Sequence, residues 1–286
     1  MQNWIRTLYT NTPAQRTLRG MSRTGLLPER LWRKMAVQRV FRVAGPDRRT
    51  FLYASTANDT IGRGLFWAGW QSMEPETIGP FYQLARQAHV VLDIGANTGI
   101  FALVACAANP HSKVIAFEPV PRVYQKLVAN IHANGWEGRC ATYMVAVAEA
   151  IGSTQFHVPL TDIPTSASLN VQGFRSHPGT LIDVPVTTID TMCAGVGRVD
   201  LVKIDVEGFE DKVLAGMQRV LAESAPAIVV ECNGDGPFAA VDATLRRLGY
   251  TFFHLLPEGP RPLARIVPDP AGHYRNFLCL PGAAHV

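Results

Sequence analysis

Residues 90–99 read VVLDIGANTG, and residues 115–119 read IAFEP. The first string predicts a buried strand that ends in Asp93 and enters a glycine turn. The apolar stretch 100–108 then predicts a buried helix, and the second strand ends in another acid, Glu118. This order is typical of the first β-α-β unit of a nucleotide-binding sheet. A carboxylate at Glu118 suits a ribose, because it can accept hydrogen bonds from both hydroxyls.

The glycines of the turn distinguish between two cofactors. A dinucleotide-binding turn reads G-x-G-x-x-G, so that the backbone can close around a pyrophosphate. Here the turn carries Gly95, Asn97 and Gly99, and Asp93 stands at its mouth, where a carboxylate would repel a pyrophosphate. The same carboxylate suits S-adenosylmethionine, which carries an ammonium and a sulfonium. The pattern therefore favours S-adenosylmethionine over NAD, while a helix-start turn that binds no ligand stays an alternative.

Strands and helices alternate along the core of the chain. We expect strands at 90–94, 113–117, 141–147, 199–205, 226–231, 250–255 and 275–280. We expect helices at 80–88, 98–108, 120–134, 209–222 and 237–248. Strict alternation predicts an α/β fold, a doubly wound and mostly parallel sheet of seven strands with helices on both faces.

The first 73 residues predict an extension ahead of this main domain, which we place at 74–286. Short helical pieces broken by Pro and Gly precede a β-hairpin, with strands expected at 40–43 and 50–53. Between about 148 and 198 the alternation breaks. We expect an inserted pair of strands there, joined by a mobile polar loop through Ser166, Ser168 and Asn170.

Composition limits the class of protein. The chain has 286 residues, 47% hydrophobic and 17% charged, which is typical of a soluble globular protein. It has no run of about 18 uncharged apolar residues, so we expect no transmembrane helix. Five scattered cysteines without C-x-x-C spacing argue against a zinc site and a disulfide framework. We therefore expect no metal and a cytoplasmic location.

The net charge of +4 conceals a basic N-terminal arm. Residues 1–50 hold eleven Arg or Lys against two acids, Glu29 and Asp47, so the arm carries +9 and the remaining 236 residues carry −5. Three interpretations stay open: a helical cap whose arginines face water, a surface for an acidic partner, or a targeting peptide. The acidic partner would be a phosphate-bearing substrate or an anionic membrane; we expect no nucleic acid.

Acids stand at the ends of four predicted strands: Asp93, Glu118, Asp205 and Glu231. Ligands of open parallel sheets bind beyond the carboxyl ends of the strands. Lys203 lies two residues before Asp205, on the same side of an apolar strand, and a buried lysine needs a partner that Asp205 or Glu231 could supply. A catalytic role for this group and an ion pair that only stiffens the sheet are both open.

These residues resemble the FkbM family of methyltransferases. The match rests on DIGANTG at 93–99, FEP at 117–119 and DLVKIDVEGFE at 200–210, of which the last string is the most specific. The resemblance covers roughly residues 74–250. It implies a Rossmann-like sheet whose last strand is antiparallel, S-adenosylmethionine as cofactor, and usually O-methylation of sugars or natural-product scaffolds.

The resemblance also implies roles for residues of this chain. The cofactor loop would be formed by Asp93, Gly95, Asn97 and Gly99. Glu118 would hold the ribose, and the backbone around Ala146 and Val147 would border the adenine. For a hydroxyl acceptor, Asp205 is our first candidate for a general base, with Lys203 and Glu231 beside it.

The predicted function is thus an S-adenosylmethionine-dependent O-methyltransferase of a small molecule. The acceptor would offer a hydroxyl or a carboxylate of a sugar or secondary metabolite, and an acidic acceptor would suit the basic arm. An NAD-dependent oxidoreductase and a non-catalytic binding module on the same scaffold stay as alternatives. The sequence leaves the oligomeric state open, and a homodimer is compatible with it.

Overall fold

The computed structural model describes residues 13–160 and 179–282, so the predicted polar loop at Ser166, Ser168 and Asn170 lies outside the described residues. The chain divides into two compact units, Met1–Pro75 and Glu76–Val286. No helix within the described ranges has the length and apolar character needed to cross a membrane.

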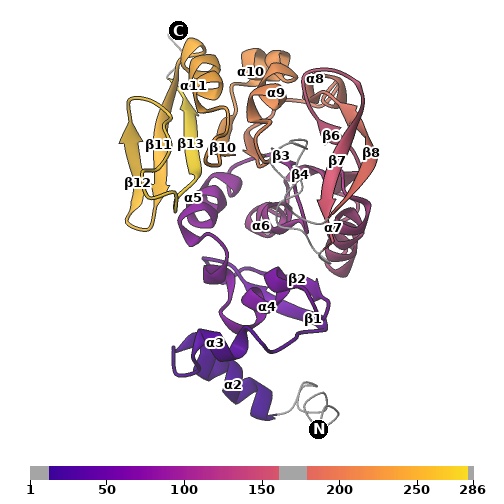
Figure 1. The fold of residues 1–286 in the computed structure, drawn as a ribbon, viewed down its shortest axis with the longest axis vertical. Coiled ribbons are helices and arrows are strands. Elements are labelled where there is room, and N and C mark those ends of the chain that lie inside the picture. Colours follow the sequence, from indigo (N-terminus) through magenta and orange to yellow (C-terminus); the bar gives the residue numbers. More distant parts are fainter. Residues whose placement is uncertain (1–12, 161–178, 283–286) are drawn as a thin grey trace. The chain divides into compact units, whose positions relative to one another are not determined.

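The N-terminal unit is built from short helices and one hairpin. Its elements are α2 (Pro13–Arg23), α3 (Glu29–Trp32), β1 (Arg39–Ala44), β2 (Thr50–Ser55), α4 (Thr60–Trp67) and the 3-10 turn η1 (Trp70–Ser72) (Figure 1). The predicted hairpin is confirmed, with Arg39 opposite Ser55 and Ala44 opposite Thr50. Aromatic rings close its core, because Phe66 of α4 packs edge-on against Phe41 of β1 at 5.1 Å between ring centroids.

The C-terminal unit contains the predicted alternation of strands and helices. In chain order its elements are α5 (Pro75–Ala85, starting at the unit boundary), β3 (Val90–Ile94), α6 (Ile100–Ala108), β4 (Lys113–Phe117), α7 (Pro121–Ala133), β5 (Cys140–Tyr143), β6 (Ala146–Val147), β7 (Gly152–Pro159), β8 (Gly179–Thr187), α8 (Ile189–Met192), β9 (Leu201–Ile204), α9 (Glu210–Ala215), α10 (Gln218–Ser224), β10 (Ala227–Glu231), α11 (Phe238–Arg247), β11 (Tyr250–Leu256), β12 (Gly259–Leu263) and β13 (Asn276–Pro281).

The main sheet is mostly parallel, as predicted. Its strand order is β12-β11-β13-β10-β9-β3-β4-β5. The pairings β10–β9, β9–β3, β3–β4 and β4–β5 are parallel. The last strand, β13, runs antiparallel between β10 and β11, as the family resemblance implies.

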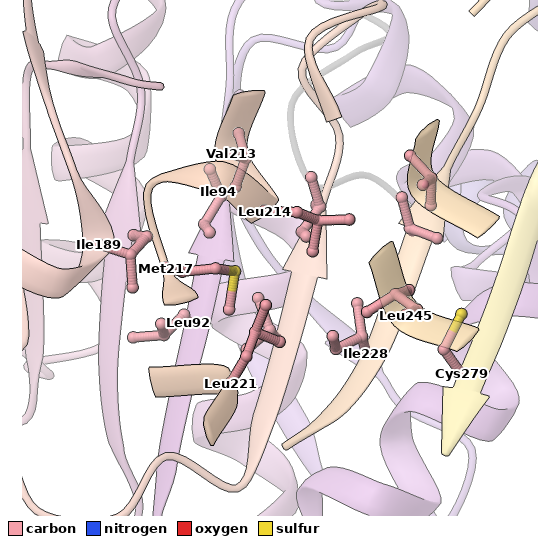
Figure 2. Close-up of a cluster of buried hydrophobic side chains, with 14 of the residues drawn as sticks. Leu92, Ile94, Ile189, Val213, Leu214, Met217, Leu221, Ile228, Leu245 and Cys279 are labelled. Carbon is pink, nitrogen blue, oxygen red and sulfur yellow. The ribbon is translucent and has the colours of Figure 1, made fainter. Parts of the chain in front are cut away.

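Helices cover both faces of this sheet, so its central strands are buried on both sides. All five positions of β3 are buried, as expected for a central parallel strand. On one face, Leu92 and Ile94 of β3 and Ile228 of β10 pack against apolar side chains of α9, α10 and α11 (Figure 2). On the other face lies α6, with Phe81 of α5 packed edge-on against Phe101.

The prediction of seven strands is wrong, because an eighth strand, β12, extends the edge of the sheet. It pairs antiparallel with β11 and contains Pro260 and Pro262. Proline lacks a backbone N–H and is tolerated mainly on edge strands, so a Pro-rich stretch gave no strand signal.

The predicted strand 141–147 is in fact two strands in different sheets. Cys140–Tyr143 forms β5 at the edge of the main sheet, whereas Ala146–Val147 forms β6 and pairs in parallel with β8. The inserted pair is confirmed: β7 and β8 are antiparallel and complete a three-stranded sheet of order β6-β8-β7. The chain therefore changes sheets at residues 144–145, which apolar patterning alone does not reveal.

The single helix predicted at 209–222 is also wrong, because it breaks into α9 and α10 around Gly216. The backbone of Gly216 passes so close to the insertion that a Cβ there would lie 2.0 Å from the carbonyl oxygen of Ala148. Glycine is needed for this approach, and the contact joins the helical layer to the residue that follows β6.

We predict that Leu92→Ala lowers the free energy of unfolding by about 2–5 kcal/mol, because it leaves a cavity in the core shown in Figure 2. Urea unfolding followed by circular dichroism measures this change. Val267→Ala removes a side chain that is 48% exposed, so it should change stability by less than about 0.5 kcal/mol. Equal effects from the two substitutions would contradict this account of the core.

Candidate active site

A pocket opens at the carboxyl end of the parallel strands, within the C-terminal unit. Its walls are the turn after β3, the connection from β4 into α7, strand β6, Phe156 of β7 and the turn after β9. It encloses about 660 Å³ of space outside atoms, part of it open to solvent. The location is where open α/β sheets bind ligands.

The turn after β3 is held between the ends of the two neighbouring strands. Gly95 and Ala96 both donate their backbone N–H to the carbonyl oxygen of Phe117 in β4, at 3.0 and 2.8 Å. Gly95 has φ = 80°, and a Cβ there would lie 1.8 Å from the carbonyl oxygen of Asp205. Only glycine fits this position, so the predicted role of Gly95 has a steric basis.

Glu118 reaches back across the same turn. Its Oε2 accepts from the backbone N–H of Asn97 at 3.0 Å, and its Oε1 accepts from that of Val120 at 2.8 Å. Each oxygen keeps a second lone pair for a ligand, and both Glu118 and Asn97 line the pocket. Burial raises the pKa of Glu118 to about 7, against the effect of the two backbone hydrogen bonds.

Asp93 lies behind the pocket rather than in its wall. Its Oδ2 accepts from the backbone N–H of Ala102 in α6 at 2.8 Å, and the residue is buried. Burial raises the pKa of Asp93 to about 7. Gly99, also predicted to contact the cofactor, begins α6 with φ = 90° and packs near Leu127 instead of lining the pocket. The structure thus places Asp93 and Gly99 where they shape the turn.

Apolar side chains form the wall opposite the turn. Ala146 and Val147, predicted to border the adenine, line the pocket with Val123 of α7 and Phe156 of β7. All four side chains are buried. The sequence did not identify Val123 or Phe156, because their strand and helix patterns reveal burial but not which cavity the side chain faces.

Lys203 lies beneath the pocket, in the middle of the sheet, and is fully buried. Its Nζ is 3.5 Å from Oδ2 of Asp205, donates to Oδ1 of Asn276 at 3.1 Å, and lies 5.1 Å from the ring centroid of Phe101. Asp205 lines the pocket and keeps 28% of its side chain exposed. The predicted partnership of Lys203 and Asp205 is therefore present, with Lys203 on the side away from the pocket.

Glu231, the third predicted catalytic residue, ends β10 opposite Asn276 of β13. Glu231 is not among the described residues that line the pocket. It lies on the same face of the sheet as Lys203, since Val229 is the register partner of Lys203 and side chains alternate along a strand. The geometry thus relates Glu231 to the buried lysine and separates it from the pocket.

Glu207 is a lining residue that sequence reasoning did not assign to the site. Its backbone has φ = 54°, a left-handed conformation that side chains rarely adopt. Its Oε2 accepts from Nδ2 of Asn233 at 2.6 Å, and burial, followed by the charge of Asp205, raises its pKa to about 7. The sequence signal that could have identified it is an acid two residues after Asp205 and directly before Gly208. Residues with a strained backbone are often found at functional sites.

The charges of the pocket wall are all negative. Three carboxyl groups line it, those of Glu118, Asp205 and Glu207, and the described lining contains no Lys, Arg or His. Such a wall disfavours phosphate groups and favours a ligand with positive charge, while the apolar side opposite suits a flat ring. Within the part of the chain that the structure describes, no cluster of His, Cys, Asp and Glu could hold a metal ion.

We predict that the unliganded protein loses stability as pH rises from about 5 to 8. The pKa of Glu118 and of Glu207 is near 7 in the folded state and lies near 4.5 when unfolded, so the folded state binds more protons in this window. Glu118→Gln and Glu207→Gln should each make the free energy of unfolding depend less on pH. For Glu118 the part removed is up to about 3 kcal/mol over this pH range. Urea unfolding at several pH values measures the slope.

The control for this prediction is Glu258→Gln, which neutralises an exposed carboxylate and should leave the slope unchanged. A slope that is the same in both pocket variants as in the unsubstituted protein would contradict the assignment of raised pKa values to Glu118 and Glu207.

Comparison with known proteins gives a consistent result. Residues 93–252 match the family model described as the methyltransferase FkbM domain. The 31-O-demethyl-FK506 methyltransferase FkbM of Streptomyces tacrolimicus is 29% identical over 192 residues, which cover 58% of this chain and 74% of that protein.

Two further relatives have names that state other specificities. The 2-O-methyltransferase NoeI of Sinorhizobium fredii is 28% identical over 49% of this chain and 62% of its own length. The hexuronic acid methyltransferase AglP of Haloferax volcanii is 26% identical over 56% of this chain and 62% of its own length.

Proposed function

This chain belongs to the methyltransferase FkbM family, and we propose that it is an S-adenosylmethionine-dependent O-methyltransferase of a small molecule. The observation that carries the cofactor proposal is the composition of the pocket wall, in which Glu118, Asp205 and Glu207 face an apolar side. Carboxylates suit the ammonium and sulfonium of this cofactor. They oppose the pyrophosphate of NAD, which was the alternative cofactor.

The residues present fit the proposed cofactor. The glycine turn lies flat against the strand ends because Gly95 carries no Cβ, which leaves the pocket side of the turn open to a ligand. Glu118 would hold the ribose hydroxyls with its remaining lone pairs, and Ala146 and Val147 would border the adenine. When bound, the cofactor supplies an activated methyl group on sulfur.

The proposed acceptor atom is oxygen. Two relatives carry O-methylation in their names, and the third is named for a hexuronic acid, so hydroxyl and carboxylate acceptors both have support. A sugar or natural-product scaffold fits these names. Holding the acceptor oxygen in line with the methyl group would supply much of the rate acceleration.

Asp205 is our candidate for the general base of a hydroxyl acceptor. It lines the pocket, and its backbone N–H donates to the carbonyl oxygen of Ile94 at 2.9 Å, which fixes its place beside the turn. Lys203 would orient this carboxylate through its Nζ, which lies 3.5 Å from Oδ2. A carboxylate acceptor would need no base.

We predict that Glu118→Ala weakens S-adenosylmethionine binding by about 1–3 kcal/mol, the usual cost of losing hydrogen bonds to a charged group. Asp93→Ala should weaken cofactor binding by a similar amount, because Asp93 supports the start of α6 through its hydrogen bond with Ala102. Loss of this bond should also lower thermal stability. Isothermal titration calorimetry and thermal unfolding measure the two effects. The exposed Glu258→Ala is the control, and unchanged affinity in both folded pocket variants would overturn the cofactor assignment.

We predict that Asp205→Asn retains S-adenosylmethionine affinity but lowers the turnover number by roughly 100-fold or more if the acceptor is a hydroxyl. Release of S-adenosylhomocysteine with hydroxylated and uronic acid acceptors measures turnover. If Asp205 serves only as the partner of Lys203, the variant should instead lose thermal stability. A stable variant with full activity on a hydroxyl acceptor would contradict both roles.

A further inference from the structure

We propose that the N-terminal unit docks on an anionic phospholipid membrane through the segment Arg19–Lys34, which we call the α2–α3 tip. The proposal concerns a surface that the methyl-transfer chemistry does not use, so it stands or falls independently of the proposed function. It is carried by three features of the tip: its charge, its exposed aliphatic side chains and a hollow beside them.

The tip is strongly basic. It holds five cationic residues against one acid, Glu29: Arg19, Arg23, Arg30, Arg33 and Lys34. Glu29 forms an exposed ion pair with Arg33 at 2.7 Å, which leaves the net charge of the tip at +4. Each basic side chain near an anionic bilayer contributes to binding, and clusters of four or more are typical of such surfaces.

Arg19 lies close enough to Arg23 and Arg39 for their charges to act on it. The guanidinium of Arg19 lies 4.6 Å from the ring centroid of Phe66 and donates to the carbonyl oxygen of the same residue at 2.8 Å. Burial, together with the charges of Arg23 and Arg39, lowers the pKa of Arg19 to about 10. Backbone and aromatic groups therefore support a concentrated positive charge, which an anionic surface would neutralise.

Aliphatic side chains project from the same segment. Leu26 is 71% exposed in the turn after α2, Leu31 is 48% exposed on α3, and Met21 is 36% exposed on α2. Leu27 folds the turn back on the helix by donating its N–H to the carbonyl oxygen of Met21 at 3.0 Å. Exposed aliphatic groups with basic neighbours are the composition by which peripheral proteins insert into the headgroup region.

The same composition distinguishes a membrane from a nucleic acid. Proteins that bind single-stranded nucleic acids offer exposed aromatic rings on which bases stack. In this unit the described aromatic side chains near the tip are buried: Trp32, Phe41, Phe66 and Trp67. Aliphatic side chains cannot stack on bases but do enter a lipid interface, so the exposed groups favour lipid.

A hollow beside the tip offers hydrogen-bond donors. It is lined by residues of the tip, α4 and η1, including Ser22, Arg33, Arg63 and Glu29. Arg33 supplies the exposed donor group of this hollow, since 69% of its side chain is exposed. The phosphate of a lipid headgroup carries hydrogen-bond acceptors, so it would pair with the donors at this hollow.

The test is flotation of the full chain with two kinds of vesicle. One is made of phosphatidylcholine alone, and the other contains about 30% phosphatidylglycerol as the anionic lipid. We expect the protein to float with the anionic vesicles and to stay behind with the neutral ones. Binding should weaken at high salt, because the Debye length falls from about 10 Å at 0.1 M to about 3 Å at 1 M. Failure to bind the anionic vesicles at low salt overturns the proposal.

Two variants locate the surface. Leu26→Ser with Leu31→Ser removes the exposed aliphatic groups, and Arg30→Glu with Lys34→Glu reverses two charges; each pair should lower partitioning about tenfold or more. The matched controls lie in the other unit. Leu181→Ser with Val267→Ser removes exposed apolar groups there, Arg86→Glu with Arg247→Glu reverses exposed charges, and both pairs should retain binding.

Other outcomes also decide the matter. If the control pairs lower partitioning as much as the tip pairs, adsorption follows net charge and the tip is not the docking site. If a single-stranded RNA of equal phosphate concentration removes the protein from anionic vesicles, a nucleic acid is the better partner and the proposal fails. S-adenosylmethionine binding, measured on every variant, shows that the catalytic unit is intact.

Discussion

The structure of the catalytic unit depends on one buried cation, Lys203. A fully buried ammonium in the centre of a sheet requires partners, and this one reaches Asp205 at 3.5 Å and Asn276 at 3.1 Å. Its charge also lowers the pKa of Asp93 and Glu210 against the larger effect of burial, so it stabilises several acids at once. The charge of Lys203 therefore offsets part of the cost of burying Asp93 and Glu210.

The acids are what make the pocket selective. Burial and mutual repulsion raise the pKa of Glu118 and Glu207 to about 7, so the pocket holds carboxyl groups that a bound cation would help to ionise. The strain at Glu207, with φ = 54°, and the absence of a Cβ at Gly95 both bring backbone and carboxyl groups to the same opening. The buried carboxyl groups and the strained backbone lower the stability of the fold, and they give the pocket a wall that suits positive charge.

The two units differ in the sign of the charged residues that they gather. The C-terminal unit concentrates acids around a pocket, whereas the N-terminal unit concentrates arginines on a small aromatic core. The asymmetry seen in the sequence, +9 in the first 50 residues and −5 in the rest, is thus divided between two compact units.

The sequence alone determined the elements whose signal is local. Strand periodicity placed 90–94 and 113–117, turn residues placed the hairpin, and the strings around Gly95 and Lys203 identified the methyltransferase family. These features depend on neighbours within a few residues, where apolar spacing and glycine conformation are decisive.

Only the tertiary structure decided which way the side chains at the strand ends face. Asp93 contacts Ala102 of α6, while Asp205 lines the pocket, although the sequence predicts both acids at the end of a strand. It also decided that residues 141–147 divide between two sheets and that 259–263 adds an edge strand. The physical reason is that pairing, burial and cavity walls are made by segments far apart in the chain, so no local pattern contains them.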